Sequence, residues 1–351
     1  MTDNTPRPVA EDIVLYEKDP STKIATITMN RPDRLNAPTA AARQRFADLV
    51  HRANVDDDVK VLVIRGIGTH FGSGADLEEQ ADMYTDNADY SPLYEFGIGD
   101  DEDVKYPPKD SYRYLANLTH HYANSSAGLR SLQDFKKISI VEAKGYCYGW
   151  HFYQAVDADL VISSDDALFG HSAWRYAGWA ARMWQWTLMM GLRKFQEMVF
   201  TGRPFTAQEM YDCNFINSVV PRDRLEDEVR KYALACSVTR PTDTVMAQKT
   251  FFEVFKQQQG EYMGSVLTGW LESLLPMMKS DGGFELDKDT FGKGLGRAVK
   301  ANDSQYPPEW RLSYAARGEQ QSKASEIDDL RRQLEETQQR LAALERKMTG
   351  G

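Results

Sequence analysis

Residues 59–77 read VKVLVIRGIGTHFGSGADL, a nearly continuous apolar run followed by a Gly-Ser-Gly turn. Residues 137–153, KISIVEAKGYCYGWHFY, repeat the order of apolar run and glycine turn. Each stretch is typical of a buried strand that leads into a helix. Glycines at such a corner let backbone N–H groups face outward at the start of the helix, where the helix dipole adds partial positive charge. Two turns of this kind together predict an oxyanion-binding site.

The neighbouring sequence predicts an α/β fold. The alternation of apolar and polar residues in Ile24–Met29 indicates a strand, and Thr39–Ala53 carries apolar residues at helical spacing. A further strand is expected within Ala155–Ser163, and helical patterns continue over about 184–256. Strand, helix and strand joined by short links are the pattern of α/β proteins.

Composition and charge restrict the function. Of 351 residues, 42% are hydrophobic and 27% charged, as in ordinary globular proteins. The formal net charge of −10 argues against a nucleic-acid partner, and no apolar run is long enough for a membrane helix. The first residues lack the pattern of a signal peptide, so we expect a cytoplasmic protein without a membrane partner. The cysteines show no metal-ligand spacing, and we predict no metal and no separate cofactor.

The sequence pattern predicts five segments. They are a polar leader at 1–12, a core at 13–215 with a long insertion at about 82–113, a helical region at 216–303, a linker at 304–322 and a coiled coil at 323–348. The coiled coil is predicted from the 3-4 spacing of Ile327, Leu330, Leu334, Thr337, Leu341, Leu344 and Met348. One such helix cannot bury its own apolar stripe, so we expect a homo-oligomer; docking of the helix on its own core is the alternative.

The order of motifs resembles the crotonase (enoyl-CoA hydratase/isomerase) superfamily. The resemblance extends over about residues 13–255. Its motifs are Ile27–Pro32, Leu35–Ala37, Asp56–Gly66, Phe71–Leu77, Gly145 with Gly149, Ala158–Ile162, Phe169–Gly170 and Thr201–Glu209. The resemblance implies a spiral of ββα turns, assembled as a trimer or a dimer of trimers. It also implies that the chain binds an acyl-CoA thioester, with coenzyme A as part of the substrate.

The resemblance further implies which residues form the site. The backbone N–H groups of Ser73 and Trp150 would hold the thioester oxygen while negative charge builds on it. Fixed donors of this kind can be the largest single contribution to catalysis. The positions that would bind the adenine of coenzyme A are Leu35, Ala37, Ala75, Asp76 and Leu77.

The chain departs from the family at the two acid/base positions. Hydratases of the family carry a glutamate at each, whereas this chain has Tyr153 at the first and, at the second, Ala173 or, if one residue is inserted, Trp174. Without two carboxylates, the usual route of water addition lacks its general acid and base. The candidate catalytic residues are therefore His171, Tyr153 and His151, because histidine titrates nearest neutral pH and Tyr153 occupies the glutamate position. Further alternatives are His120, His121, Glu78 and Glu79.

The acyl group is predicted from the aromatic residues. Five tryptophans lie at 150–186, among them Trp174, and they favour a cyclic or aromatic acyl group, with an aromatic core as the alternative. The reaction that these candidate residues favour is hydrolytic C–C bond cleavage of a ketone-bearing substrate. Two alternatives stay open: an enoyl-CoA hydratase/isomerase with atypical acid/base residues, and a catalytically silent oligomeric scaffold.

Overall fold

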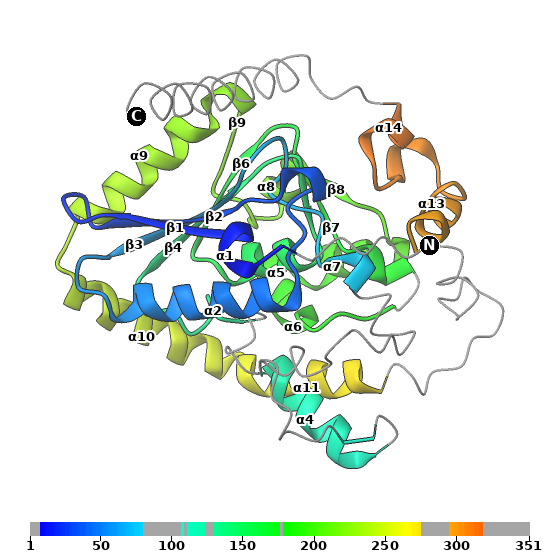
Figure 1. Ribbon diagram of the computed structural model, residues 1–351, viewed down its shortest axis with the longest axis horizontal. Helices are drawn as coiled ribbons and strands as arrows, with labels where there is room; N and C mark the ends of the chain where they lie inside the picture. Colours follow the sequence, from blue (N-terminus) through cyan, green and yellow to red (C-terminus); the bar gives the residue numbers. More distant parts are fainter. Residues whose placement is uncertain are drawn as a thin grey trace, which may run out of the picture.

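The computed structural model describes residues 8–79, 107–108, 111–123, 130–175, 178–274 and 295–318. A six-stranded sheet in the order β1-β2-β3-β4-β6-β9 lies at its centre (Figure 1). The β1–β2 pair is antiparallel, and the other four pairs are parallel. The strands are β1 (Val14–Asp19), β2 (Ile24–Met29), β3 (Val61–Gly66), β4 (Ile138–Ala143), β6 (Leu160–Ser164) and β9 (Ser218–Val220).

A second, three-stranded sheet lies beside the first and carries the site. It contains β5 (Tyr146–Tyr148), β7 (Leu168–Gly170) and β8 (Phe205–Thr206), with β5 and β7 parallel. An isolated bridge between Gly72 and Cys147 joins the turn after β3 to this sheet. The chain thus turns from the large sheet into the small one at both glycine-containing stretches.

Helices cover both faces of the large sheet because β3 is apolar on both sides. Its residues Leu62 and Ile64 belong to the main core together with Phe46 of α2 (Ala40–Val55). Val61 and Val63, which alternate with them, pack in a smaller core that includes residues of α9 (Leu225–Val238). Side chains that alternate along a strand point to opposite faces, and Figure 1 shows α2 and α9 on opposite sides of the sheet.

The remaining helices are shorter or lie towards the C-terminal end. Those near the site are η1 (Pro32–Arg34), α5 (Trp150–Asp157), η3 (Ser172–Arg175), α6 (Met183–Met190), α7 (Leu192–Thr201) and α8 (Ala207–Asp212). The others are α1 (Ala10–Ile13), α4 (Tyr112–Ala123), η4 (Arg222–Arg224), α10 (Thr242–Gln258), α11 (Glu261–Ser273), α13 (Leu295–Asp303), η6 (Pro308–Trp310) and α14 (Tyr314–Arg317).

The strands and the helix expected from periodicity are present, but two segment boundaries need correction. Strand β9 pairs with β6 and therefore belongs to the large sheet of the core. The expected boundary at 215/216 would assign this edge strand to the helical region instead. The expected linker at 304–322 is packed against the core over residues 304–318, where Tyr314 is buried. Nearly all of the predicted insertion at 82–113 and all of the predicted coiled coil at 323–348 lie outside the described residues.

Candidate functional site

The two glycine turns lie side by side. The Gly72 N–H donates to the Tyr146 carbonyl at 2.7 Å, and the Tyr148 N–H donates to the Gly72 carbonyl at 2.9 Å. A Cβ atom on Gly149 would lie 3.0 Å from the Cα atom of Gly74, and both glycines have positive φ angles, of 55° and 105°. Only glycine tolerates both the close approach and the backbone conformation. The structure therefore brings together the two turns from which an oxyanion site was predicted.

The Ser73 N–H, one of the two predicted oxyanion donors, already has an acceptor. It donates to the Leu35 carbonyl at 3.0 Å. Leu35 and Asn36 both have left-handed backbone conformations, with φ angles of 52° and 59°. The buried Asn36 amide fixes this loop by donating to the carbonyls of Ile67 and His70, each at 2.8 Å. A substrate oxygen at Ser73 would thus have to displace the carbonyl of Leu35.

The second predicted donor, Trp150, is the first residue of α5. It follows Gly149, and a Cβ atom on Gly74 would lie 3.7 Å from its backbone nitrogen. Its side chain points into the core, where it is 2% exposed and meets the ring of Phe46 edge-on at 5.0 Å. The tryptophan side chain at this position therefore forms part of the hydrophobic core.

Tyr153 and His171 form a hydrogen-bonded pair where hydratases of the family carry their first glutamate. The Tyr153 hydroxyl oxygen lies 2.9 Å from Nε2 of His171. Tyr153 comes from the first turn of α5, and His171 directly follows β7. Two residues that are 18 positions apart are joined because β5 and β7 are neighbouring strands. Ala173, at the position of the second glutamate, presents only a methyl group.

The protonation of this pair follows from the other ring nitrogen of His171. The Ala173 N–H donates to Nδ1 of His171 at 3.1 Å. A backbone N–H can only donate, so Nδ1 carries no proton, and the neutral imidazole holds its proton on Nε2. Burial lowers the pKa of His171 to about 4, which keeps the ring neutral at pH 7. His171 thus donates to the oxygen of Tyr153, and the proton of the tyrosine hydroxyl is not used in this hydrogen bond.

His151 does not take the position that a direct catalytic role requires. Its ring is completely buried and fills the space in which a side chain at residue 72 would lie, with ring atoms 2.1 Å from an added Cβ atom. Nδ1 of His151 accepts from the Gly74 N–H at 3.3 Å. Burial lowers the pKa of His151 to about 3, opposed in part by the Asn36 backbone. The geometry gives His151 a structural function beneath the turn instead of the acid/base function predicted from the sequence.

The tryptophans near the site form part of the hydrophobic core. Trp174 is 5% exposed, lies 5.7 Å from His171 between ring centroids, and packs edge-on against Trp186 at 5.3 Å. Trp186 is fully buried and also contacts Tyr153, with 5.3 Å between ring centroids. The Trp174 side chain is thus a packing neighbour of the Tyr153–His171 pair. The aromatic-core alternative accounts for Trp150, Trp174 and Trp186.

Glu78 and Glu79, the alternatives for the missing glutamates, and Asp76, predicted at the nucleotide, all have structural partners. Glu79 accepts from the Ala40 N–H at 2.7 Å at the beginning of α2, and Glu78 pairs with Arg34 on the surface at 2.6 Å. Asp76 pairs with Arg31 at 2.5 Å, which lowers the pKa of its carboxyl against the effect of burial. A contact of Asp76 with a nucleotide would therefore come from its backbone.

Apolar side chains flank the predicted nucleotide-binding positions. Leu35 and Leu77 are each 38% exposed, on two loops that the Ser73–Leu35 hydrogen bond holds together. On the same two loops, Ala37 is buried and Ala75 is half-buried. The side chains of His120 and His121, on α4, lie outside the described part of the structure.

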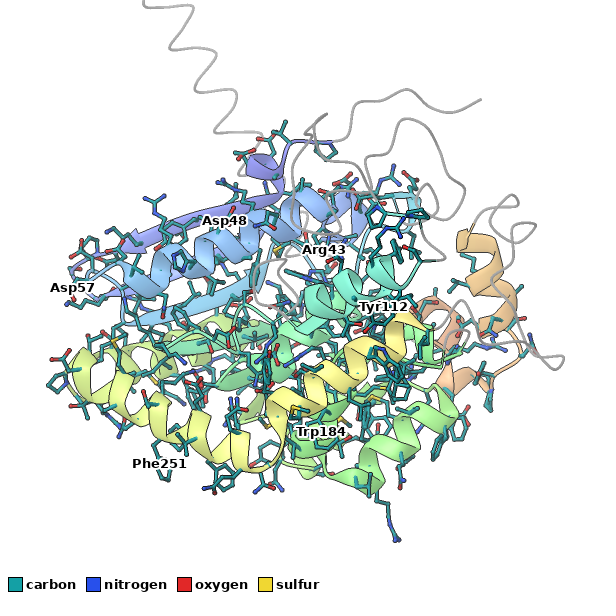
Figure 2. All side chains as sticks on the ribbon, turned by 90° about the horizontal axis from the view of Figure 1, so that it is seen from below. Arg43, Asp48, Asp57, Tyr112, Trp184 and Phe251 are labelled. Atoms are coloured by element: carbon teal, nitrogen blue, oxygen red, sulfur yellow. The ribbon has the colours of Figure 1, made fainter. Side chains whose placement is uncertain are left out.

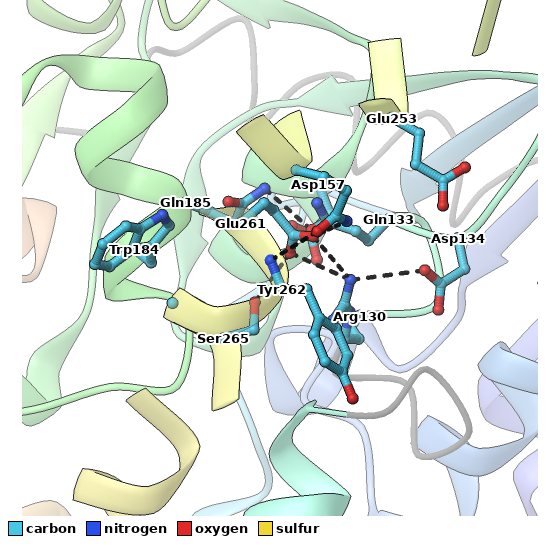
Figure 3. A network of polar contacts seen from close by, with 12 residues as sticks. Arg130, Gln133, Asp134, Asp157, Trp184, Gln185, Glu253, Glu261, Tyr262 and Ser265 are labelled. Carbon is cyan, nitrogen blue, oxygen red and sulfur yellow. Dashed lines mark hydrogen bonds and ion pairs between the residues drawn. The ribbon is translucent and has the colours of Figure 1, made fainter. Parts of the chain in front are cut away.

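A buried network of charged side chains supports the other end of α5 (Figure 3). Asp157, the last residue of α5, accepts from Arg182 at 2.5 Å, and both side chains are enclosed. Arg130 pairs with Glu261 at 3.2 Å in the same network. Burial raises the pKa of Asp157, and the nearby Arg182 opposes this change. The network fixes the helix that carries Trp150 and Tyr153.

The fold and the paired turns define a class of protein, the crotonase-like α/β proteins. Among solved structures, the chain is similar to an enoyl-CoA hydratase/isomerase from Xanthobacter autotrophicus Py2 (TM-score 0.64, 20% identity, covering 84% of this chain and 98% of that one). It is also similar to an enoyl-CoA hydratase from Mycobacterium smegmatis (TM-score 0.65, 21% identity, covering 84% and 94%). A curated relative in Mycobacterium bovis, named "Probable enoyl-CoA hydratase echA8", is 23% identical over 255 residues, which are 71% of this chain and 85% of the relative.

The sequence of the chain also matches a family model. Residues 19–100 and 110–266 match the enoyl-CoA hydratase/isomerase family, and the chain belongs to this family within the crotonase superfamily. It is accordingly a crotonase-superfamily enzyme that acts on an acyl-CoA. The relatives and solved structures described above are named as enoyl-CoA hydratases or hydratase/isomerases, so the comparisons favour the hydratase/isomerase alternative and give no support to hydrolytic C–C cleavage.

Sequence reasoning missed one neighbour of the site, residues 295–318. This stretch was expected to be partly a linker, yet it contacts Arg175, four residues after His171. Its aromatic residues Tyr306, Trp310 and Tyr314 were the available signal, because a solvated linker rarely needs them. Within the described ranges, no group of three or more metal-ligating side chains occurs, and no helix is long and apolar enough to cross a bilayer.

Proposed function

We propose that this enzyme shifts a double bond in an enoyl-CoA thioester by proton transfer, with Tyr153 as the acid/base group. The observation that carries the proposal is the 2.9 Å contact between the Tyr153 oxygen and Nε2 of His171, beside an alanine at the second acid/base position. Adding water requires one group to activate the water and another to protonate carbon. Moving a proton between two carbons requires one group only.

The reaction uses the phenolate form of Tyr153. The phenolate takes a proton from the carbon next to the double bond, and the electron pair moves through the conjugated system to the thioester oxygen. The phenol then returns the proton to the other end of the system. Neutral His171 donates its Nε2–H to the tyrosine oxygen throughout, which stabilises the phenolate because a hydrogen bond to a charged group is stronger than one to a neutral group.

In this proposal, the thioester oxygen displaces the Leu35 carbonyl from the Ser73 N–H and is then held by the backbone N–H groups of Ser73 and Trp150. Support comes from the packing of the two turns around Gly74 and Gly149, which places both residues next to the contact. Each donor of such a site can contribute about 3 to 4 kcal/mol to stabilising the developing charge. The coenzyme A portion of the substrate lies against the two loops that carry Leu35, Ala37, Ala75 and Leu77. Asp76 contacts it through its backbone and not through its carboxylate.

The substrate experiment separates this proposal from the alternatives. Purified protein is supplied with matched 3-enoyl-CoA and 2-enoyl-CoA esters, with short and cyclic acyl chains, and the products are separated by chromatography and mass spectrometry. We expect 3-enoyl-CoA to be converted to 2-enoyl-CoA without a gain of 18 Da, the mass of the water that hydration adds. Formation of 3-hydroxyacyl-CoA would support a hydratase instead, and no conversion of any ester would favour the silent scaffold.

We further propose that the chain self-associates through α10 and α11. Four residues of α10 are exposed although apolar, namely Phe251, Phe252, Val254 and Phe255, and Figure 2 shows Phe251 directed outward. Met263, Leu267 and Trp270 extend this surface along α11. Contiguous apolar surface of this kind marks interaction sites. A second copy of the chain is the expected partner, as a trimer or a dimer of trimers.

A further inference from the structure

We infer that residues 295–318, here called the C-terminal segment, position the Tyr153–His171 pair, and that Arg175 is the positioning residue through which they do so. The C-terminal segment comprises α13, η6 and α14 and lies beyond residue 266, where the family match ends. The inference rests on the proposed acid/base function of Tyr153. It assigns a function in the site to a part of the chain that the family does not define.

The Arg175 guanidinium connects the C-terminal segment to the core. It donates to Asp303 at 2.5 Å, to the carbonyl of Trp310 at 2.5 Å and to the carbonyl of Gly202 at 2.8 Å. Its charged group also lies 3.7 Å from the ring centroid of Tyr306. Three separate donors and a ring face thus fix one side chain, which only the planar guanidinium of arginine allows.

The burial of this contact makes it a strong constraint. The Arg175 side chain is 1% exposed and that of Asp303 is 9% exposed. The same Asp303 oxygen accepts from the Leu312 N–H at 2.9 Å, which ties the ion pair to the backbone that follows η6. A Cβ atom on Gly202 would lie 2.6 Å from Cγ of Arg175, so the glycine that ends α7 makes room for the arginine. A buried charge of this kind cannot leave its partner without a large penalty.

The position of Arg175 determines the geometry of His171. Both belong to one tight turn, in which the Ala173 N–H donates to Nδ1 of His171 and the Trp174 N–H donates to the His171 carbonyl at 3.2 Å. Arg175 is the last residue of η3, which begins directly after His171. Holding Arg175 therefore holds the Ala173 N–H in the position that keeps the His171 proton on Nε2, facing Tyr153.

The C-terminal segment also contacts the strand that leads to Tyr153. The Tyr148 hydroxyl donates to the Leu312 carbonyl at 2.7 Å, and the Tyr314 N–H donates to the Tyr146 hydroxyl at 3.1 Å. The rings of Tyr146 and Tyr314 stack at 4.8 Å. Tyr146 and Tyr148 belong to β5, which precedes Gly149 and α5. The C-terminal segment thus holds both chain segments whose ends meet in the Tyr153–His171 hydrogen bond.

The test compares Arg175→Met, which removes all donors, with Arg175→Lys, which retains the charge, in the full-length chain. Hydrogen–deuterium exchange read by mass spectrometry reports the opening of residues 171–175 and needs no substrate. We expect exchange in this peptide to be about tenfold faster in Arg175→Met and intermediate in Arg175→Lys. We expect kcat for the isomerisation to fall about tenfold or more in Arg175→Met while KM changes little, because misplacement affects the reacting geometry.

A matched control is Lys249→Met. It breaks a partly buried ion pair in which Lys249 of α10 lies 2.6 Å from Asp159, the residue just before β6. It should lower Tm without changing kcat or the exchange of residues 171–175. If Arg175→Met does not fold, Tyr306→Leu removes the ring beneath the guanidinium and is measured in the same way.

Wild-type exchange of residues 171–175 in a folded variant would overturn the inference. Faster exchange with unchanged kcat would also overturn it, because the segment would then stabilise the turn without affecting the reaction. If the wild-type protein shows no isomerisation, the proposed function fails, while the exchange measurement still decides whether the C-terminal segment positions the turn.

Discussion

Nε2 of His171 lies 2.9 Å from the hydroxyl oxygen of Tyr153, and the direction of this hydrogen bond is set on the opposite side of the imidazole ring, where the Ala173 N–H donates to Nδ1. The pair therefore consists of a neutral histidine donor and a tyrosine acceptor. This arrangement differs from a histidine general base, whose Nε2 would need a free lone pair. In the proposed mechanism, the chemistry of the site is accordingly centred on the tyrosine oxygen.

Removal of that oxygen tests the acid/base assignment. Tyr153→Phe leaves the ring against Trp186 and should lower kcat by about 10²- to 10⁴-fold, with KM nearly unchanged, because general acid–base catalysis contributes on that scale. Tyr16→Phe is the control, since the buried Tyr16 hydroxyl has no hydrogen-bond partner in the described structure. Steady-state kinetics of both variants decide, and a Tyr153→Phe enzyme with near wild-type kcat would contradict the assignment.

Two substitutions of His171, one without a hydrogen-bond donor and one with a donor, test whether the Nε2–H group is needed. His171→Leu removes the hydrogen bond to Tyr153 and should lower kcat by about 10- to 100-fold, since a hydrogen bond to a charged oxygen contributes roughly 1.5 to 3 kcal/mol. His171→Gln carries an amide N–H that can replace Nε2–H and should retain more activity than His171→Leu. Equal activity of the two variants would show that the donor is not used.

The pH profile of the wild-type reaction gives an independent measurement. Because burial lowers the pKa of His171 to about 4, the histidine stays neutral across pH 5.5–8 and should produce no inflection there. A descending limb centred near pH 6.5 that disappears in His171→Gln would mean that the histidine itself changes charge during the reaction.

The contact between Gly72 and His151 predicts a suppressor relationship. Gly72→Ala places a Cβ atom 2.1 Å from the His151 ring and should destabilise the protein by about 1 to 3 kcal/mol or more. His151→Ala leaves a cavity at the same place, so the double variant should be more stable than the sum of the single effects indicates. Tm values of the two single variants and the double variant complete the cycle. Strict additivity would be incompatible with the packing described here.

Buried neutral histidines predict acid sensitivity. Burial lowers the pKa of His70 to about 4 and that of His151 to about 3, with Arg222 adding to the effect on His70. These folded-state values lie below the unfolded value near 6.5, so the unfolded chain binds more protons between about pH 4 and 6.5. The free energy of unfolding should fall as pH is lowered through this range, by roughly 2 to 3 kcal/mol per histidine.

Denaturant titrations at several pH values measure this dependence. In the wild-type protein, the Tyr146 N–H donates to Nδ1 of His70 at 3.0 Å. His70→Asn keeps an acceptor for this N–H but cannot take up a proton. Its stability should therefore depend less steeply on pH, by up to about one proton per chain. An unchanged slope would show that His70 is not a neutral histidine in the folded state.

The exposed surface of α10 and α11 predicts the oligomeric behaviour. Phe251→Glu combined with Phe255→Glu puts two charges on that surface and should reduce the mass measured by light scattering. Phe200→Glu is the control, because Phe200 is also exposed but lies on α7. If all three proteins have the same mass, α10 does not mediate self-association.

Much of the fold could be predicted from local patterns. The strand at Ile24–Met29, the helix beginning near Ala40 and the two glycine turns each have a short-range cause, because apolar periodicity and glycine act within a few residues. The positions of the missing glutamates also follow from the order of motifs. Tyr153 and His171 could be selected in the same way, but not the direction of the hydrogen bond between them.

Other features could not be predicted, because they depend on contacts between distant residues. His151 was a reasonable catalytic candidate by its position, yet the ring lies beneath Gly72, 79 residues earlier in the chain. Asp76 was expected at the nucleotide, and its carboxylate is instead held by Arg31 across 45 residues. The stretch at 304–318 is predicted as a linker because its prolines interrupt periodicity, while the backbone of Leu312 and Tyr314 forms hydrogen bonds with the tyrosine hydroxyls of β5 that no local pattern reveals.

The sequence by itself determined the family, the α/β class and the place of the turns, since each is encoded in residues that are neighbours along the chain. Only the tertiary structure decided the protonation of His171, the occupation of the Ser73 N–H by the Leu35 carbonyl, and the contact of Arg175 with Asp303 across 128 residues. The physical reason is that a hydrogen-bond partner, unlike a helix or a strand, is chosen by what lies within about 3 Å in space, whatever its distance along the chain.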